Sequence, residues 1–308
     1  METRQIGSLD VSVIGLGTNN FGFYMDEHEV GPVLDAALAA GINFIDTADS
    51  YATSEERIGK LLGSRRDDVV LATKFASPVD GGTGGARPDY IRSAVERSLR
   101  LLRTDRIDLY QIHRPDPDTP IADTLAALDE LVRAGKVREI GCSNFTAAQL
   151  DAAAAAVADG AARFVSVQNH YNLLHRDDEA EVLPAAQRLG VAYVPYFPLA
   201  SGLLTGKYAR GADAPEGTRL AAQGERGERA LGNADFDVVE ALTAWAAERG
   251  HTLLELAFAW LLAKPGVASV IAGATKVAQV DANAAVTWRL TDADGAAVDA
   301  LTAAPRGS

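Results

Sequence analysis

The chain has 308 residues, of which 47% are hydrophobic and 23% charged, and its formal net charge is −13. This composition is typical of a globular protein with a large core, and the acidic balance argues against a nucleic-acid footprint, which would need clustered Lys and Arg. No apolar run approaches the ~18 residues of a membrane span, and Cys142 is the only cysteine, so no internal disulfide can form.

The chain begins with METRQIGSLDVSV, which is charged and alternating rather than apolar like a signal segment, so we expect a cytoplasmic protein. Within it, Thr3–Val13 alternates around Gly7-Ser8 and predicts a small β-hairpin that caps the bottom of the following fold. Short runs rich in Val and Ile then recur, as expected of strands buried on both faces. These runs are Val13–Leu16, Ile42–Ile45, Val69–Thr73, Ile107–Ile112, Val137–Cys142, Phe164–Gln168, Val191–Pro195 and Ala268–Ala272.

Amphipathic stretches separate the strand candidates. In Tyr90–Leu102 the apolar residues share one helical face, and Pro88 just before it favours a helix start. Gly135 follows Ile121–Ala134 as a glycine after a helix would. Further helices are expected at Phe236–Arg249, Thr252–Ala263 and Asp292–Ala303. The segment Pro195–Asp235, which follows the seventh predicted strand, shows no clear hydrophobic periodicity. This predicts a long loop that is functional or mobile.

Eight strands with intervening helices predict an α/β fold. The simplest arrangement is a (β/α)8 TIM barrel with an N-terminal hairpin cap and extra C-terminal helices, as a single domain over residues 1–308. A doubly wound open sheet is the alternative, and it would normally carry a Gly-rich loop after its first strand. Here Gly15-Leu-Gly17-Thr-Asn-Asn20 has Asn20 in place of the third glycine, which weakens that alternative but leaves it open.

The catalytic residues of parallel barrels follow the C-terminal ends of the strands. Those ends place Asp46 and Tyr51 after the second strand, Lys74 after the third and His113 after the fourth. A lysine ammonium beside a tyrosine favours the phenolate, and a carboxylate would hold that lysine in place. His113 could polarise a carbonyl oxygen or share a proton with Tyr51. This set suits acid catalysis at a carbonyl, with the hydride supplied by a cofactor.

Motifs around these residues resemble the aldo-keto reductase family. The segment Gly41-Ile-Asn-Phe-Ile-Asp46-Thr-Ala-Asp-Ser-Tyr51 is similar to the signature of that family. Further matches follow in chain order: Thr73-Lys74, Gln111-Ile-His113, Gly141-Cys-Ser143-Asn144-Phe145, Gln168, Tyr196-Phe-Pro198-Leu199, Gly202-Leu-Leu-Thr-Gly-Lys207 and Gly273-Ala-Thr275-Lys276 with Gln279 and Asn283. The ordered series spans nearly the whole chain, which makes the resemblance specific.

The resemblance implies NADPH-dependent reduction of an aldehyde or ketone, a small-molecule substrate, with Tyr51 as general acid/base. It implies a tetrad of Asp46, Tyr51, Lys74 and His113 and an NADPH lying across the barrel mouth. It assigns Ser143, Asn144 and Gln168 to the nicotinamide carboxamide, Tyr196 to stacking on the ring, Lys276 and Gln279 to the 2′-phosphate, and Asn283 to the adenine. The other implied cofactor contacts are Gly17, Thr18, Asp46, Pro198, Leu199, Gly202, Lys207, Gly273 and Thr275. Lys276 also begins a predicted helix, where backbone N–H groups favour phosphate.

The sequence departs from the family pattern at several positions. Ala52 stands where the family usually has Gly, and we expect this to shift the loop beside Tyr51. Phe197 replaces a usual small polar residue and Ala272 a usual proline, so we expect the pyrophosphate contacts near them to differ from those of the family. Arg114, in Arg114-Pro-Asp-Pro117, is either a substrate contact on the pocket wall or a solvated rim charge. Gly81–Gly85 predicts a flexible loop over the mouth.

Two alternative functions stay open. Aldo-keto reductases resemble potassium-channel β-subunits, so an NADP-binding redox-sensing or regulatory subunit with little turnover is possible. Lys74 could instead form a Schiff base in an aldolase-like lyase. His170 and His175 lack a ligand-like spacing with another His or Cys, so we expect no metal. The loops that would choose the substrate are Pro78–Arg87, Arg114–Pro120 and the segment after Tyr196, and neither the substrate nor the oligomeric state follows from the sequence.

Overall fold

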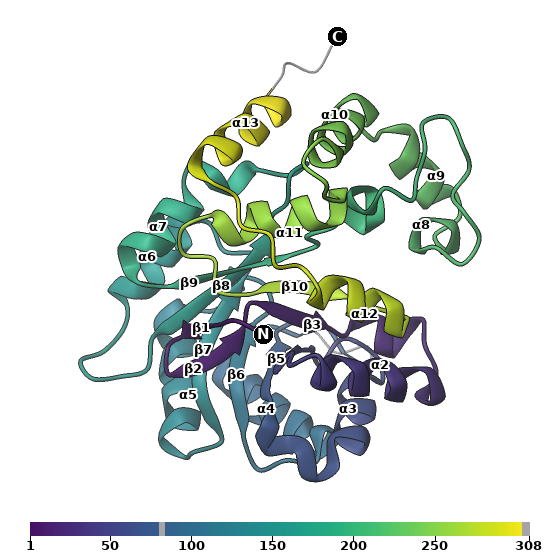
Figure 1. Cartoon of the computed structure of the whole chain (residues 1–308). Helices are drawn as coiled ribbons and strands as arrows, with labels where there is room; N and C mark the ends of the chain where they lie inside the picture. Colours follow the sequence, from purple (N-terminus) through teal and green to yellow (C-terminus); the bar gives the residue numbers. More distant parts are fainter. Residues whose placement is uncertain (80–83, 304–308) are drawn as a thin grey trace.

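A closed barrel of eight parallel strands forms the centre of the molecule (Figure 1), as seen in a computed structural model that describes residues 1–79 and 84–303. Neighbouring strands pair in chain order, and β10 closes the ring between β3 and β9. The barrel strands are β3 (Ile14–Gly17), β4 (Phe44–Asp46), β5 (Val70–Phe75), β6 (Ile107–Ile112), β7 (Val137–Ser143), β8 (Phe164–His170), β9 (Ala192–Tyr196) and β10 (Val270–Gly273). Each lies on one of the predicted runs, so the TIM-barrel prediction is confirmed and the open-sheet alternative is wrong.

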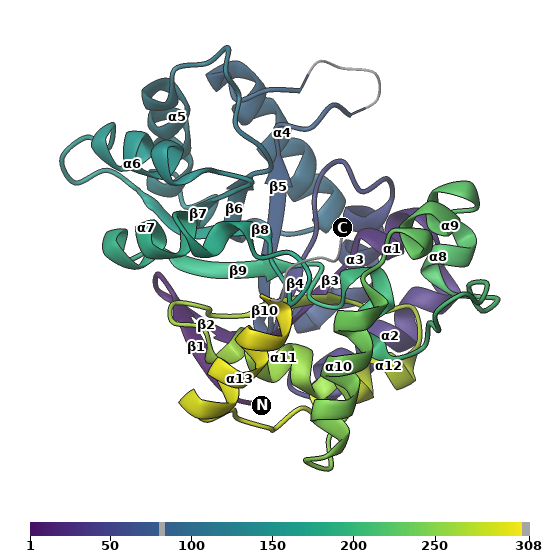
Figure 2. The same cartoon turned by 90° about the horizontal axis from the view of Figure 1, so that it is seen from above.

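Burial on both faces explains the apolar strands. Every residue of β5 and β6 is buried, because one face points into the barrel and the other against the helices. Two neighbouring parallel strands must be joined by a crossover connection, and helices outside the barrel provide these connections (Figures 1 and 2). The helices are α1 (Asn19–Phe23), α2 (Glu27–Ala39), α3 (Ser54–Leu62), α4 (Pro88–Leu102), α5 (Ile121–Arg133), α6 (Ala147–Ala155), α7 (Val182–Leu189), α8 (Arg219–Ala222), α9 (Glu225–Gly232), α10 (Phe236–Ala247), α11 (Leu253–Ala263), α12 (Val277–Ala284) and α13 (Asp292–Thr302).

An antiparallel hairpin closes the floor of the barrel. Its strands are β1 (Thr3–Ile6) and β2 (Leu9–Ser12), and the two-residue turn between them has Gly7 at φ +57°. Ile6, Leu9 and Val11 are buried and join one apolar cluster with residues of the barrel interior. That cluster also contains Phe44, Val70, Ala72, Leu109, Val165, Val194, Ala268 and Ile271. The predicted hairpin cap is therefore confirmed.

The segment Pro195–Asp235 differs from its prediction as a long loop. It contains a short 3₁₀ segment, η3 (Ala200–Thr205), followed by α8 and α9, which protrude on the right in both views (Figures 1 and 2). A small cluster of Tyr208, Leu220 and Phe236 holds this segment together. These helices have four to eight residues, too few for a periodic pattern to show in the sequence.

Two further sequence expectations concern loops and membranes. The predicted flexible loop Gly81–Gly85 lies largely outside the described residues, of which only Gly84 and Gly85 belong to it. Among residues 1–79 and 84–303, no helix combines the length and the apolar character needed to cross a membrane.

Candidate active site

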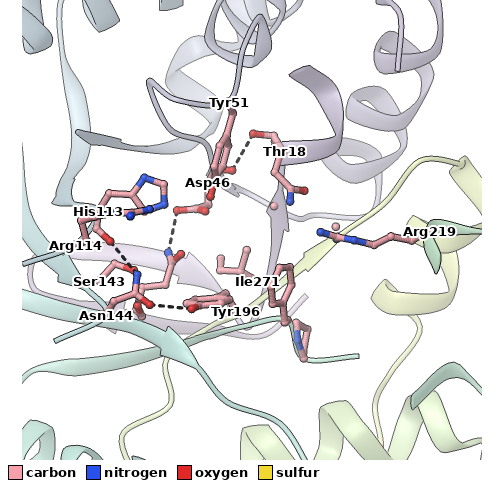
Figure 3. Close-up of a pocket in the computed structure, with 16 residues that line it drawn as sticks. Thr18, Asp46, Tyr51, His113, Arg114, Ser143, Asn144, Tyr196, Arg219 and Ile271 are labelled. Carbon is pink, nitrogen blue, oxygen red and sulfur yellow. Dashed lines mark hydrogen bonds between the residues drawn. The ribbon is translucent and has the colours of Figure 1, made fainter. Parts of the chain in front are cut away.

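A cavity of about 520 Å³ opens at the barrel mouth, where the C-terminal ends of the strands meet (Figure 3). Many of the predicted site residues line it: Gly17, Thr18, Asp46, Tyr51, His113, Ser143, Asn144, Gln168, Tyr196, Pro198 and Gly273. Arg114 and Phe197, which the sequence associated with the pocket wall and the pyrophosphate, also line it, with three residues that it did not single out: Asn19, Arg219 and Ile271. The structure thus brings residues from most strand ends to one cavity.

A buried ion pair lies at the base of the cavity. The Lys74 ammonium is 2.5 Å from Asp46 Oδ2 and also donates to the Thr47 carbonyl at 3.1 Å. The second oxygen of Asp46 accepts from Gln168 Nε2 at 2.9 Å and Gln111 Nε2 at 3.2 Å. Because every one of these groups is buried, the hydrogen bonds fix the carboxylate and the ammonium in one arrangement.

Tyr51 is held above this ion pair by the loop between β4 and α3. The Lys74 ammonium lies 5.4 Å from the centroid of the Tyr51 ring. Helix α1 packs directly against the loop: a Cβ at Gly22 would come within 1.8 Å of the Tyr51 carbonyl oxygen, so only glycine fits there. Ala52, where the family usually has Gly, adopts φ +46°, so the loop beside Tyr51 keeps a left-handed residue without the glycine that favours it.

Burial and the charge of Lys74 shift the pKa of the Tyr51 phenol in opposite directions. Burial raises the pKa of the Tyr51 phenol, while the nearby Lys74 ammonium acts in the lowering direction, as the sequence predicted. Burial outweighs the ammonium, so the phenol keeps its proton at neutral pH. Burial would lower the pKa of Lys74, but the charge and the hydrogen bond of the Asp46 carboxylate act in the raising direction; the pKa is raised overall, so Lys74 stays an ammonium.

His113 lies next to Tyr51 in the cavity. The two rings pack edge to face, with their centroids 5.7 Å apart. On the other side of the imidazole, Nδ1 lies 3.2 Å from Ser77 Oγ and 3.4 Å from Ser50 Oγ. Burial, together with the charge of Lys74, lowers the pKa of His113 to about 3, so the ring is neutral at physiological pH.

Polar groups on β7, β8 and β9 line the opposite wall. Tyr196 OH donates to Asn144 Oδ1 at 2.8 Å, and Asn144 Nδ2 donates to the His113 carbonyl at 2.9 Å (Figure 3). The Ser143 hydroxyl donates to the Gln168 carbonyl at 2.6 Å. These bonds connect this wall to the His113 side of the cavity.

Other predicted site residues lie outside the cavity lining. The catalytic Lys74 is beneath the cavity, and the remaining cofactor residues lie just before, on or after η3 (Leu199, Gly202, Lys207) or just before and on α12 (Thr275, Lys276, Gln279, Asn283). Lys276 is exposed at the start of α12, as predicted. Gln279 Oε1 accepts from the Thr275 backbone N–H at 2.8 Å.

The backbone after β9 is unusually strained. Phe197, Ala200 and Ser201 have φ of +54°, +45° and +57°, which side chains other than glycine rarely adopt. Such strain persists where the surrounding structure requires it, most often at ligand sites. The segment coincides with the motif matched to the cofactor pyrophosphate.

Arg219 is a cavity residue that sequence reasoning missed. It begins α8, reaches the cavity on the side opposite His113 (Figure 3) and lies 4.9 Å from the Phe197 ring centroid. Its Nε is buried and has no hydrogen-bond partner within the described residues. No periodic pattern placed this part of the chain near the site; the only signal was an arginine within a long segment after a barrel strand.

Comparison with known proteins assigns the family. The sequence profile of the Aldo/keto reductase family matches residues 13–303, so the chain belongs to that family, whose members are oxidoreductases. The aldo-keto reductase YhdN of Bacillus subtilis is 37% identical, over 93% of this chain and 88% of its own length. A probable voltage-gated potassium channel subunit beta of Oryza sativa subsp. japonica is 36% identical, over 92% and 90%.

A solved structure supports the same assignment. The aldo-keto reductase AKR11C1 from Bacillus halodurans, in its holo form, aligns with a TM-score of 0.82 and 32% identity. The alignment covers 98% of this chain and 96% of that one. The resemblance predicted from the sequence motifs is confirmed.

Proposed function

We propose that this protein reduces an aldehyde or ketone to an alcohol with NADPH, and that Tyr51 delivers the proton. The observation that carries the proposal is the buried 2.5 Å Lys74–Asp46 pair beneath a protonated Tyr51. When bound, the reduced nicotinamide supplies the hydride, which no side chain can provide. The proton then passes from the Tyr51 hydroxyl to the carbonyl oxygen, and the Lys74 ammonium stabilises the phenolate that remains.

His113 positions the substrate carbonyl. Because Ser77 and Ser50 lie at Nδ1 and the ring is neutral, Nε2 is the nitrogen available to donate to the carbonyl oxygen. Together with Tyr51 it places two donors on one oxygen, which orients the carbon toward the opposite wall. That wall carries Ser143, Asn144 and Tyr196, which we assign to the nicotinamide.

The remaining cavity residues fit a dinucleotide with phosphates. Arg219 Nε is buried and finds no partner among the described residues, and a phosphate oxygen at that position would satisfy it. The left-handed residues Ala200 and Ser201 lie between Tyr196 and Lys207, in the segment that the family resemblance assigns to the cofactor. We assign the pyrophosphate to Arg219 and Lys207, and the adenosine 2′-phosphate to Lys276 with Gln279.

The Schiff-base alternative is disfavoured by the charge of Lys74. A nucleophilic lysine must lose its proton, whereas the Asp46 carboxylate 2.5 Å away holds Lys74 as an ammonium. The redox-sensing alternative keeps support from the channel-subunit relative, because tight cofactor binding would serve sensing as well as catalysis.

The experiment is to mix the protein with NADPH and a panel of aldehydes and ketones and to follow the loss of NADPH absorbance. We expect turnover that falls by about 10²–10⁴-fold in Tyr51→Phe, the range for removing a general acid. NADP⁺ affinity, measured by fluorescence, should stay within about twofold because the ring remains. Tight NADP⁺ binding without turnover on any carbonyl would favour the sensing role, and full activity of Tyr51→Phe would refute the proposed acid.

A further inference from the structure

One cation in the cavity is not used by the proposed chemistry. Arg114 directly follows His113 at the end of β6 and lies on the same wall of the cavity (Figure 3). Its side chain is exposed to the cavity mouth, and within residues 1–79 and 84–303 it makes no ion pair or side-chain hydrogen bond. Most other arginines of this acidic chain pair with a carboxylate, as Arg97 does with Asp49 at 2.9 Å.

The acid nearest in sequence does not neutralise Arg114. Asp116 accepts hydrogen bonds from the Ala86 N–H at 2.7 Å, the Thr119 hydroxyl at 2.8 Å and the Asp118 N–H at 3.0 Å. Asp116 therefore organises the turn after β6. Among residues 1–79 and 84–303, the only carboxylate lining the cavity is Asp46, which is already paired with Lys74. The cavity thus carries an excess of positive charge on a protein of net charge −13.

Arg114 lies apart from the groups that we assign to the cofactor phosphates. Those groups, Arg219, Lys207 and Lys276, lie at the β9 and β10 side of the barrel. Arg114 comes from β6, beside the two side chains that meet the carbonyl oxygen. A cation there faces the part of the substrate beyond the reacting carbon.

We propose that Arg114 binds an anionic group of the substrate, so that the preferred carbonyl compounds carry a carboxylate or a phosphate. This inference rests on the proposed function and adds its substrate class. A guanidinium presents several N–H donors in a planar fork that matches either group. Without an anionic group the guanidinium stays solvated at the mouth and contributes nothing to substrate binding.

The test compares matched substrates on wild type and Arg114→Gln in the full-length protein with NADPH. The carboxylate pair is 4-carboxybenzaldehyde and its methyl ester, which differ chiefly in charge; the phosphate pair is glyceraldehyde 3-phosphate and glyceraldehyde. We expect wild type to prefer the charged member of at least one pair. Arg114→Gln should lower kcat/KM for that member by about 10–100-fold, mainly through KM, and for the neutral member by less than about threefold.

Two controls separate this effect from general charge loss and from misfolding. Arg133→Gln removes the same charge at the far end of α5, away from the mouth, and should change neither substrate pair. The affinity of Arg114→Gln for NADP⁺ should equal that of wild type, which also shows that the variant is folded.

Each outcome decides a separate point. A response confined to one pair supports the inference and identifies the anion. An equal loss for charged and neutral members, no preference in wild type, or weakened NADP⁺ binding in Arg114→Gln would overturn it while leaving carbonyl reduction intact. Absence of turnover on every carbonyl in wild type would overturn the proposed function itself.

Discussion

At the floor of the barrel, Ile6, Leu9 and Val11 of the hairpin are at most 1% exposed and belong to one apolar cluster. At the mouth, the residues buried to a similar extent include the charged pair Asp46 and Lys74, at 2% and 0% exposure. Burying apolar surface stabilises a fold directly, whereas a buried ion pair at best offsets the cost of removing its charges from water. The same barrel therefore uses its two ends for different purposes.

The backbone shows the same division. In the part of the chain that the structure describes, seven residues other than glycine have positive φ: Ala52, Ala76, Arg103, Asn144, Phe197, Ala200 and Ser201. All but Arg103, which ends α4, lie in segments that follow the C-terminal end of a barrel strand. In the floor hairpin, the positive φ falls on Gly7, where it carries little cost. Strain is thus concentrated where the candidate site lies, and the floor supplies stability that offsets it.

The largest effect is expected from Lys74→Met at the mouth. Removing the ammonium leaves Asp46 buried with only neutral donors and leaves Tyr51 without the charge that stabilises its phenolate. We expect kcat/KM to fall by about 10²–10⁴-fold and the free energy of unfolding by about 3–5 kcal/mol. Carbonyl reduction assays and urea denaturation measure the two losses. Lys60→Met on the surface of α3 is the control, and a fully stable Lys74→Met would show that the pair contributes nothing to the fold.

Leu9→Ala at the floor should separate stability from activity. Leu9 is 1% exposed, and truncation leaves a cavity in the hairpin cluster that costs about 2–5 kcal/mol. We expect a lower midpoint in urea but an unchanged kcat at 25 °C, because the site lies at the other end of the strands. Asp10→Ala, on the exposed side of the same hairpin, should change stability by less than about 0.5 kcal/mol. A drop in the kcat of folded Leu9→Ala would break the division between floor and mouth.

Lys276→Met tests the outer edge of the mouth. If Lys276 meets the 2′-phosphate, its loss should lower kcat/KM for NADPH by about 10–100-fold and leave NADH nearly unchanged, since NADH lacks that group. Initial rates with each cofactor at a fixed carbonyl concentration measure the preference. An equal fall for both cofactors would assign Lys276 to some other part of the dinucleotide or to the fold.

The floor and the strands were more predictable than the mouth. Buried parallel strands require Val and Ile runs, and the β6 prediction, Ile107–Ile112, coincides with the observed strand. Tyr51 and His113 could be located because each follows a strand end at a short distance. Arg219 could not, because α8 is held by local contacts such as the Thr218 hydroxyl accepting from the Ala221 N–H, and these leave no periodic pattern. Nor did the sequence show that burial outweighs the ammonium at Tyr51, since that balance depends on how the loop packs.

The smallest effect concerns the pH dependence of stability at the mouth. The folded-state pKa of His113 is lowered to about 3 from 6.5, so between these values the unfolded chain binds more protons. The stability that His113 contributes is therefore complete above pH 6.5 and is lost as the pH falls through that window. Comparing wild type with His113→Asn by urea denaturation, we expect the difference between them to fall by about 1 kcal/mol from pH 6.5 to 5.5. Wild type must be compared with the variant because other groups titrate in the same pH range, and the comparison cancels their contribution. Asp49 is one such group: burial raises its pKa from 3.8 to about 7, so its own contribution makes stability fall as the pH rises between these values. A difference that stays flat would mean that the imidazole titrates alike in both states, and His113 would then not be held neutral at the site.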